Sequence, residues 1–347
     1  MSTRQYTSVF LGMMLLVLLP CTALGHIHPS ICVTKKGTIV VVHYDENNAK
    51  VQISRSIDGG KNWSASVPVP GIKAGGTYPG ALTALSDGRV VVTWNWYPKG
   101  KTSPRETQFA VSSDEGKTWS EPRSLPQQGA QSNTDRPFVR HGILELSANE
   151  WVFPRSNQTV VLNVHSGKAT PFADGRNHGG VPIVRTAKGT LISGSGRRST
   201  DQGKTWQQIK PFPTMAYHTD MIALTNGLIV AANDGGADGG MGGRGTCIRL
   251  VMSRDDGQSW DFKGGVEIYQ TGQPTVKQRT RGGVGNPQLA QLNQDSLGVV
   301  FFAHQESKDA ESVVVAHGER GVRVLFARVP LRKLESGGKT QRSARSR

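Results

Sequence analysis

The sequence contains little cysteine, no long apolar run and an excess of basic over acidic residues. Only three of its 347 residues are cysteine, which is too few for a disulfide framework. The longest apolar run, residues 9–20, is too short to cross a bilayer comfortably as a helix. Against 41 Lys and Arg stand 26 Asp and Glu, so the formal net charge is +15. The basic residues are scattered and no nucleic-acid-binding signature is present, so an anionic glycan is a better expected partner than nucleic acid.

The two ends of the chain differ in composition from its body. Residues 1–25 have the pattern of a secretory signal peptide: Arg4 at the start, then the apolar run, then Ala23-Leu24-Gly25 as a cleavage site. Cys21 leaves a lipid anchor as an alternative. We expect an exported protein, secreted or periplasmic, without stable membrane insertion. Residues 331–347 are polar and basic and predict a disordered tail.

Glycine and an eight-residue repeat are what the body has in abundance. With 42 Gly and 18 Pro and few helical stretches, the composition favours an all-β chain rich in turns. The pattern S-x-D-x-G-x-[T/S/N]-W occurs four times, and its Asp and Gly suit a tight hairpin turn. Its Trp would pack as an apolar plug. The four copies are residues 56–63 (SIDGGKNW), 112–119 (SSDEGKTW), 199–206 (STDQGKTW) and 253–260 (SRDDGQSW).

A second repeat gives the number of structural units. A polar residue or Gly followed by an apolar run recurs six times, as at residues 36–41 (KGTIVV) and 87–92 (DGRVVV). Six such hairpins at a period of about 40–65 residues predict a six-bladed β-propeller over residues 26–330. The expected blades are 26–72, 73–128, 129–174, 175–214, 215–272 and 273–330, and the third strand of the fourth blade is the least defined.

The octapeptide resembles the Asp-box, or bacterial neuraminidase repeat, of the sialidase-type β-propellers. In that family the box lies on the turn between the third and fourth strands of a blade, away from the active site. The resemblance therefore implies a structural role for the four box carboxylates, and no metal or cofactor is expected. These carboxylates are Asp58, Asp114, Asp201 and Asp255.

The resemblance extends to the sialidase catalytic segments only in part. Residues 26–29 (HIHP) look like the F-R-I-P segment, but the arginine that grips the sialic-acid carboxylate falls on Ile27. Residues 285–289 look like the segment that carries the tyrosine nucleophile, and Asn286 stands at the tyrosine. The fold resemblance thus covers nearly all of residues 26–330, while the catalytic signature is largely missing, so the resemblance implies a divergent centre.

Propeller geometry selects candidate site residues, because the starts of first strands and the ends of second strands meet at the central channel on one face. His, Arg, Asp, Tyr and Trp gathered there are typical of a sugar site. The candidate catalytic residues are Asp135, His178, Tyr217, His218 and Asp220. The candidate substrate-binding residues are His28, Tyr78, Trp94, Trp96, Arg136, Arg281 and Asn286.

Three functions remain open at this point. In an exo-acting glycoside hydrolase with a non-standard active site, the leading reading, Asp135 and Asp220 would be the main carboxylates, and a carboxyl separation of about 5–5.5 Å would predict retention. In a polysaccharide lyase acting on uronic-acid glycans, His178 or His218 with Tyr217 would supply acid and base. The third reading is a non-catalytic glycan-binding propeller. Trp94 and Trp96 would either stack against sugar or anchor a loop.

Overall fold

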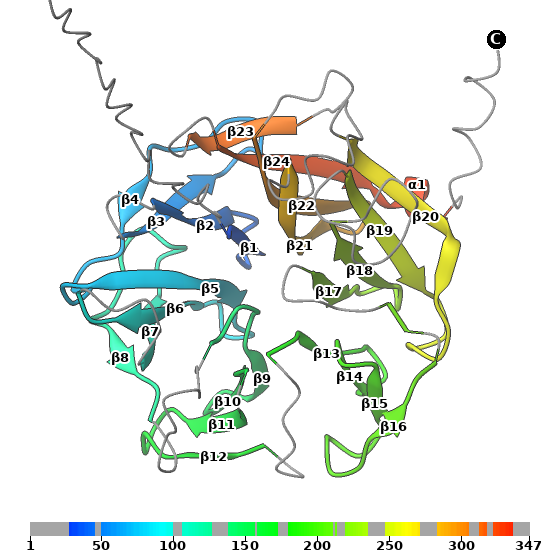
Figure 1. Cartoon of the computed structure of the whole chain (residues 1–347), viewed down its shortest axis with the longest axis horizontal. Helices are drawn as coiled ribbons and strands as arrows, with labels where there is room; N and C mark the ends of the chain where they lie inside the picture. The colour runs from blue at the N-terminus through cyan, green and yellow to red at the C-terminus, as the bar shows by residue number, and fades with distance from the viewer. Residues whose placement is uncertain are drawn as a thin grey trace, which may run out of the picture.

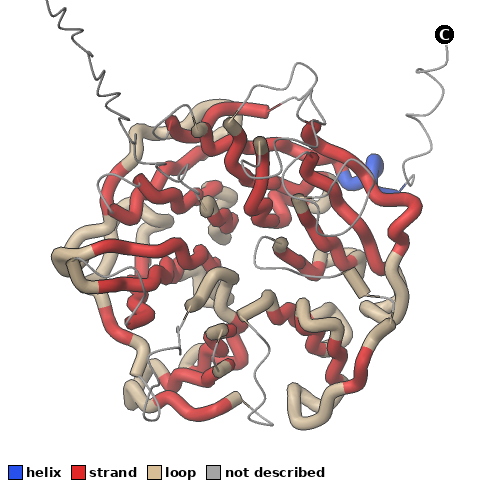
Figure 2. Tube along the Cα trace, viewed as in Figure 1, coloured by secondary structure: helices blue, strands red, loops and turns tan. Residues whose placement is uncertain are grey.

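The chain forms six four-stranded antiparallel sheets arranged in a ring around a central axis (Figure 1). Nearly all of its regular structure is strand, as Figure 2 shows, and α1 (Leu331–Glu335) is short. No helix in the described part of the chain is long and apolar enough to cross a membrane. The computed structural model describes residues 28–45, 50–99, 106–126, 138–156, 158–172, 180–210, 212–213, 219–234, 247–270, 283–304, 312–317 and 322–335.

Each sheet is one blade built from one continuous stretch of sequence. Blade one contains β1 (Ser30–Val33), β2 (Ile39–Asp45), β3 (Lys50–Ser56) and β4 (Val67–Pro68). Blade two contains β5 (Gly76–Ala84), β6 (Val90–Tyr97), β7 (Glu106–Ser112) and β8 (Arg123–Ser124). Blade three contains β9 (Leu144–Ser147), β10 (Glu150–Pro154), β11 (Thr159–Asn163) and β12 (Ala169–Pro171).

The second half of the ring continues in the same way. Blade four contains β13 (Ile183–Arg185), β14 (Leu191–Ser193), β15 (Arg197–Ser199) and β16 (Gln207–Gln208). Blade five contains β17 (Asp220–Ala223), β18 (Ile229–Asn233), β19 (Cys247–Ser253) and β20 (Asp261–Gln270). Blade six contains β21 (Val284–Asn293), β22 (Ser296–Ala303), β23 (Ser312–His317) and β24 (Arg323–Pro330). The prediction of six blades is confirmed, and the third strand of blade four has only three residues.

Blade six departs from the strand order of the other five. In blades one to five the strands follow one another outward in chain order, whereas in blade six the order is β21-β22-β24-β23. The last strand of the sequence therefore pairs with β22 along its whole length, and β23 lies outside it. A repeat pattern in the sequence does not distinguish these two orders, because both use the same hairpin between β23 and β24.

The hydrophobic core is divided among the six seams between neighbouring blades. The second strands are continuous apolar runs, such as residues 39–42 (IVVV), because both of their faces are covered by adjacent sheets. One cluster joins blades one and two through Val40 and Trp94, and another joins blades six and one through Phe326 and Ile31. The other four clusters fill the remaining seams in the same way. Each blade is thus stabilised by both neighbours.

The four Asp boxes lie on the turns between third and fourth strands and share one hydrogen-bond pattern. In blade four, Asp201 Oδ1 accepts from Ser199 Oγ at 2.7 Å and from Thr205 N at 2.9 Å, and Asp201 Oδ2 accepts from Thr205 Oγ1 at 2.6 Å. These hydrogen bonds lower the pKa of Asp201 to about 2, and the bond from the Thr205 hydroxyl contributes most to this shift. Trp206 Nε1 donates to Gly203 O at 2.9 Å. The box is therefore a self-contained turn built around its carboxylate.

Two boxes also bind the preceding blade through the residue that follows the box aspartate. This residue adopts the left-handed conformation, with φ of 65° at Glu115 and 60° at Asp256. In blade five, Asp256 Oδ2 accepts from Thr190 Oγ1 at 2.6 Å and from Arg198 Nη2 at 2.7 Å, both in blade four. In blade two, Glu115 Oε2 accepts from Thr38 Oγ1 of blade one at 2.8 Å. We call these two contacts the inter-blade locks.

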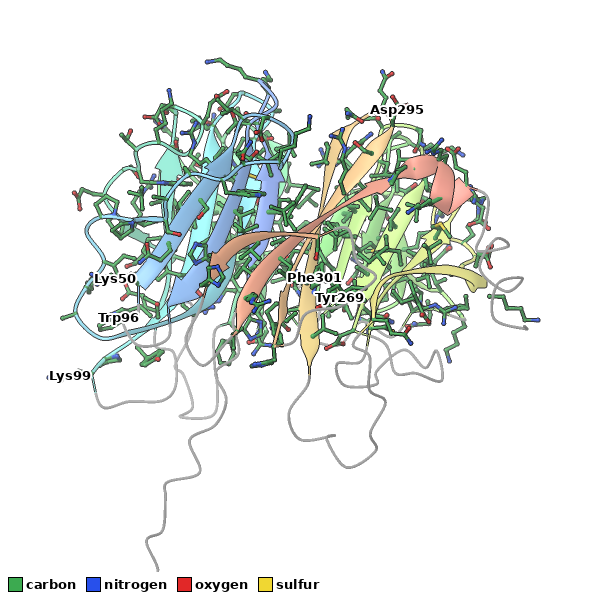
Figure 3. All side chains as sticks on the ribbon, turned by 90° about the horizontal axis from the view of Figure 1, so that it is seen from above. Lys50, Trp96, Lys99, Tyr269, Asp295 and Phe301 are labelled. Carbon is green, nitrogen blue, oxygen red and sulfur yellow. The ribbon has the colours of Figure 1, made fainter. Side chains whose placement is uncertain are left out.

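The two faces of the ring are distinct. The turns between first and second strands lie on the same face as the Asp boxes, because alternate strands run in opposite directions; we call this the Asp-box face. The opposite face, where first strands begin and second strands end, is called the loop face. In Figure 3, Asp295, in a turn on the Asp-box face, lies on the opposite side of the molecule from Trp96 and Lys99.

Candidate functional site

The first strands of the blades line the axis, and Asp220 opens the first strand of blade five there. Its side chain is buried, and its Oδ2 accepts a hydrogen bond from Leu289 N of blade six at 2.9 Å. This backbone donor fixes the orientation of the carboxyl group. Asp220 is thus a fixed acidic group at the centre of the ring.

His141, which the sequence analysis did not select, faces this carboxylate from blade three. Its Nδ1 lies 3.7 Å from Asp220 Oδ1, and the residue is only 1% exposed. Among the described residues, neither ring nitrogen of His141 has a hydrogen-bond partner. Buried imidazole nitrogens are normally satisfied, so such a group at an axial position indicates a place where water or a ligand would bind.

The segment that carries His141 is held on both sides by blade two. Val139 N donates to Asn95 Oδ1 and Asn95 Nδ2 donates to Val139 O, each at 2.9 Å. Two residues beyond His141, Ile143 N donates to Thr83 Oγ1 at 2.9 Å. Val139 also forms an isolated antiparallel bridge with Arg155, just beyond β10. These contacts place the imidazole at the axis without a continuous strand.

Gly142 allows this close approach. A Cβ at Gly142 would lie 2.9 Å from Thr83 Oγ1 and 3.3 Å from Leu82 O. The sequence therefore did carry a signal for His141, namely a His-Gly pair directly before residues 143–146 (ILEL). The entry to this first strand was instead predicted earlier in the chain, at Asp135 and Arg136.

An imidazole beside a fixed carboxylate is an arrangement suited to acid–base chemistry. With its Nδ1 toward Asp220, His141 would hold Nε2 available to take a proton from, or give one to, a bound molecule. Asp220 would then fix the tautomer and stabilise the protonated ring. The same pair could instead leave Asp220 as the reacting carboxyl, with His141 tuning its charge.

Three other candidates lie near the axis on the loop face. His28 is 7% exposed and directly precedes β1. Asn286 is 4% exposed, has φ of 52° and lies in a register shift of β21 between Gly285 and Gln288. Asn tolerates this left-handed conformation better than most residues. Tyr78 lies in β5, where its backbone is opposite Asn95.

The two tryptophans expected to offer a stacking surface differ in their exposure. Trp94 is fully buried in the seam of blades one and two, and its Nε1 donates to Gln108 Oε1 at 2.9 Å. A sugar therefore has no access to its ring, and the alternative reading as an apolar anchor describes it better. Trp96 is half-buried, and the Nζ of Lys73 lies 5.4 Å from its ring centroid, a cation–π contact.

The remaining predicted site residues lie outside the described part of the chain, so their proximity to Asp220 stays a prediction. They are Asp135, Arg136, His178, Tyr217, His218 and Arg281. Within the described ranges, no group of three or more His, Cys, Asp or Glu side chains is placed to hold a metal ion.

Comparison with known proteins supports the fold. The family model described as BNR/Asp-box repeat matches residues 197–208, the box of blade four. A probable oligoxyloglucan-reducing end-specific xyloglucanase from Neosartorya fischeri is 28% identical in an alignment of 261 positions that covers 67% of this chain and 30% of that protein. The chain thus spans less than a third of the length of this relative.

Two solved structures show how far the architecture is shared. A Hadza microbial sialidase superposes with a TM-score of 0.59 at 16% identity, over 88% of this chain and 66% of that one. An α-L-arabinanase from Penicillium chrysogenum superposes with a TM-score of 0.56 at 16% identity, over 88% and 94%. At such identities the likeness concerns the fold. The chain is a six-bladed β-propeller of the sialidase-like fold that carries BNR/Asp-box repeats.

Proposed function

We propose that this protein is an exported glycoside hydrolase that acts on the ends of glycan chains, with Asp220 and His141 at the base of its site. The observation that carries the proposal is the buried carboxylate–imidazole pair at the axis, where the first strands of blades three and five meet. The carbohydrate-acting names of the xyloglucanase, sialidase and arabinanase support a sugar as the substrate class.

The position of the pair favours attack at a chain end. Asp220 and His141 are buried within the ring of first strands, so the middle of a polymer would not reach them. A single terminal sugar that enters along the axis from the loop face would reach Asp220 and His141. Asp220 would act as the acid or base toward the glycosidic oxygen or water, and His141 would control its charge.

The departures from the sialidase pattern argue against ordinary sialic acid as the substrate. Sialidases use a tyrosine nucleophile because the anomeric carbon carries a carboxylate. Asn286, at the matching position, cannot supply that nucleophile, and without it most of the transition-state stabilisation would be lost. A neutral or uronic sugar suits the described residues better.

A polysaccharide lyase is a second candidate because of one specific observation: the ring nitrogens of His141 have no hydrogen-bond partner within the described ranges. Abstraction of the proton beside a uronate carboxyl needs a base whose pKa lies near neutrality, and imidazole meets that need. In this alternative Asp220 orients His141 and a basic side chain neutralises the uronate. The predicted residue for that task is Arg136.

The test is to incubate the purified protein with a panel of oligosaccharides that includes arabino-, xylogluco-, sialyl- and uronic-acid oligomers. Release of reducing ends reports hydrolysis, and ultraviolet absorbance of an unsaturated uronate reports elimination. Asp220→Asn and His141→Asn should each lower turnover by about 10²–10⁴-fold, as expected for loss of an acid–base group.

Asp295→Asn is the matched control, because Asp295 is exposed on the Asp-box face and lies away from the pair. It should leave turnover unchanged, and circular dichroism should show all three variants folded. Full activity in both axial variants would contradict the proposed centre. Saturable glycan binding without turnover on any oligomer would favour the non-catalytic reading.

A further inference from the structure

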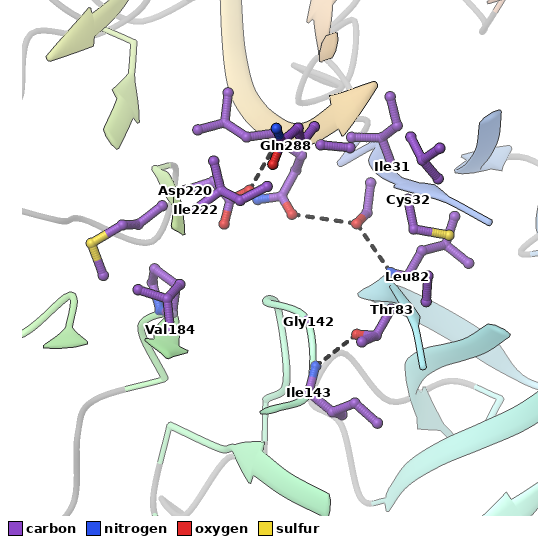
Figure 4. Close-up of a pocket in the computed structure, with 18 of the residues that line it drawn as sticks. Ile31, Cys32, Leu82, Thr83, Gly142, Ile143, Val184, Asp220, Ile222 and Gln288 are labelled. Carbon is purple, nitrogen blue, oxygen red and sulfur yellow. Dashed lines mark hydrogen bonds between the residues drawn. The ribbon is translucent and has the colours of Figure 1, made fainter. Parts of the chain in front are cut away.

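A cavity of about 320 Å³ lies on the axis, enclosed by the first strands (Figure 4). All six blades contribute to its wall, through β1, β5, β13, β17, β21 and residues 142–143 before β9. Its volume is at the lower end of the range of small-molecule sites. The proposed sugar site approaches Asp220 from the loop face and leaves the rest of this cavity unassigned.

Burial along the strands shows toward which face the cavity opens. Where the lining strands begin, Ser30, Asp220 and Gln288 are between 2% and 8% exposed. Where the lining ends, at Val33, Val184, Ile222 and Gln291, the side chains are half-buried. Exposure therefore rises toward the Asp-box face, and the cavity is reached from the side opposite the proposed sugar site.

The inner end of the cavity is polar and its position is fixed by cross-blade hydrogen bonds. Ser30 Oγ donates to Gln288 Oε1 at 3.3 Å and accepts from Leu82 N at 3.0 Å. Asp220 Oδ2 accepts from Leu289 N at 2.9 Å. These bonds, drawn as dashed lines in Figure 4, hold the polar groups of blades one, two, five and six in one arrangement. Such a preformed polar end is what orients a small ligand.

The charge and shape of the lining select the ligand. Among the lining residues Asp220 is the one charged side chain and none is aromatic, and the half-buried side chains toward the opening include the aliphatic Val33, Val184 and Ile222. A carboxylate accepts up to about four hydrogen bonds, and the contacts of Asp220 with Leu289 N and His141 leave acceptor capacity. An anion would be repelled there, and a sugar would find no stacking surface.

We propose that this cavity is a binding site for a small alkylammonium ligand, whose ammonium group binds Asp220 while its hydrocarbon chain contacts the aliphatic wall. A charge-assisted hydrogen bond to a buried carboxylate is stronger than a neutral one. A chain of about four carbons fits within the cavity volume of about 320 Å³. The cavity shares Asp220 with the proposed catalytic pair, but ligand binding is measured without turnover, so the two proposals are tested separately.

The test is saturation-transfer NMR of the whole protein with three probes of equal chain length: n-butylammonium, 1-butanol and butyrate. We expect transfer to n-butylammonium that saturates with concentration, weaker transfer to 1-butanol and none to butyrate. Ile222→Trp, which fills the cavity, should weaken n-butylammonium binding at least about tenfold. Asp220→Asn should remove the preference for the ammonium over the alcohol.

Ile57→Trp is the matched control, because Ile57 is 82% exposed in the box of blade one and does not line the cavity. It should bind n-butylammonium as the parent protein does. Val184→Phe, a smaller filling change at another lining position, replaces Ile222→Trp if that variant does not fold. Equal transfer to all three probes, no transfer to n-butylammonium, or unchanged binding in the folded filling variant would each overturn the proposal.

Discussion

The inter-blade lock between Asp256 and Arg198 allows a quantitative prediction of stability. The side chains are 7% and 18% exposed, so solvent screens their contact weakly. Asp256→Asn keeps the shape of the side chain but removes its charge, and leaves the Arg198 guanidinium without its counter-charge. Because hydrogen bonds to charged groups are each worth about 1.5–3 kcal/mol, and the amide retains part of the contact with Thr190, we expect a loss of about 2–3 kcal/mol.

For a folded part of about 300 residues this loss corresponds to a fall in Tm of about 3–5 °C, from the usual unfolding entropy per residue. Thermal unfolding followed by circular dichroism at pH 7 measures it. A double-mutant cycle with Arg198→Gln isolates the coupling between the two side chains. Additive effects in the cycle, or a Tm change of less than about 1 °C in Asp256→Asn, would refute the reasoning.

The pH dependence of this effect has a definite sign. Burial raises the pKa of Asp256, but hydrogen bonds from Thr190 and Arg198 outweigh it, and the net effect is a lowered pKa. Because the folded-state pKa is depressed, the stabilisation is fully present above the unfolded value of about 3.9 and is lost as the pH falls through the folded pKa. The Tm difference between the parent and Asp256→Asn should therefore be constant from pH 7 to about pH 5 and shrink below about pH 4.

Three further predictions concern separate features of the fold. Asp201→Ala should lower the Tm by loosening one box turn, while turnover or ligand binding per folded molecule, measured in parallel, stays near normal. Gly142→Ala should destabilise the protein by about 1–3 kcal/mol, since its Cβ would approach Thr83 Oγ1 to 2.9 Å, and denaturant titration measures this loss. Burial raises the pKa of the Cys32 thiol to about 12, so in a Cys21→Ser, Cys247→Ser background a thiol reagent at pH 8 should label Cys32 only after unfolding.

The architecture was predictable because both repeats act locally. Each Asp box encodes its own turn, and each apolar run with its preceding Gly encodes one hairpin, so their number and order give the blades. The strand order of blade six was not predictable in this way, because the pairing of β24 with β22 joins segments whose contact no local pattern records. The choice between β23 and β24 as the inner strand depends on burial of a complete seam.

The sequence predicted which strand ends meet at the axis, but not which of their side chains form the candidate site. Asp220 was selected because it begins a first strand. His141 was missed because its segment leaves the regular strand pattern and is held by side chains of blade two instead. Trp94 was selected by position along β6, but the side of the strand on which it lies packs into a seam, and both sides of this strand have similar apolar character.

The continuous sequence of each blade has a consequence for how the ring closes. In the described residues, blade one is built from residues 30–68 and blade six from residues 284–330, and no strand is exchanged between them. The chain therefore links the blades covalently across five of the six seams. At the sixth, blades six and one are joined by side chains, chiefly the cluster around Phe326 and Ile31 and the hydrogen bond from Ser30 to Gln288. Bringing the ends of about 300 residues together carries a loop-closure entropy of about 5 kcal/mol. Side-chain packing at this one seam must offset that entropy, so it is the seam at which the ring would first open.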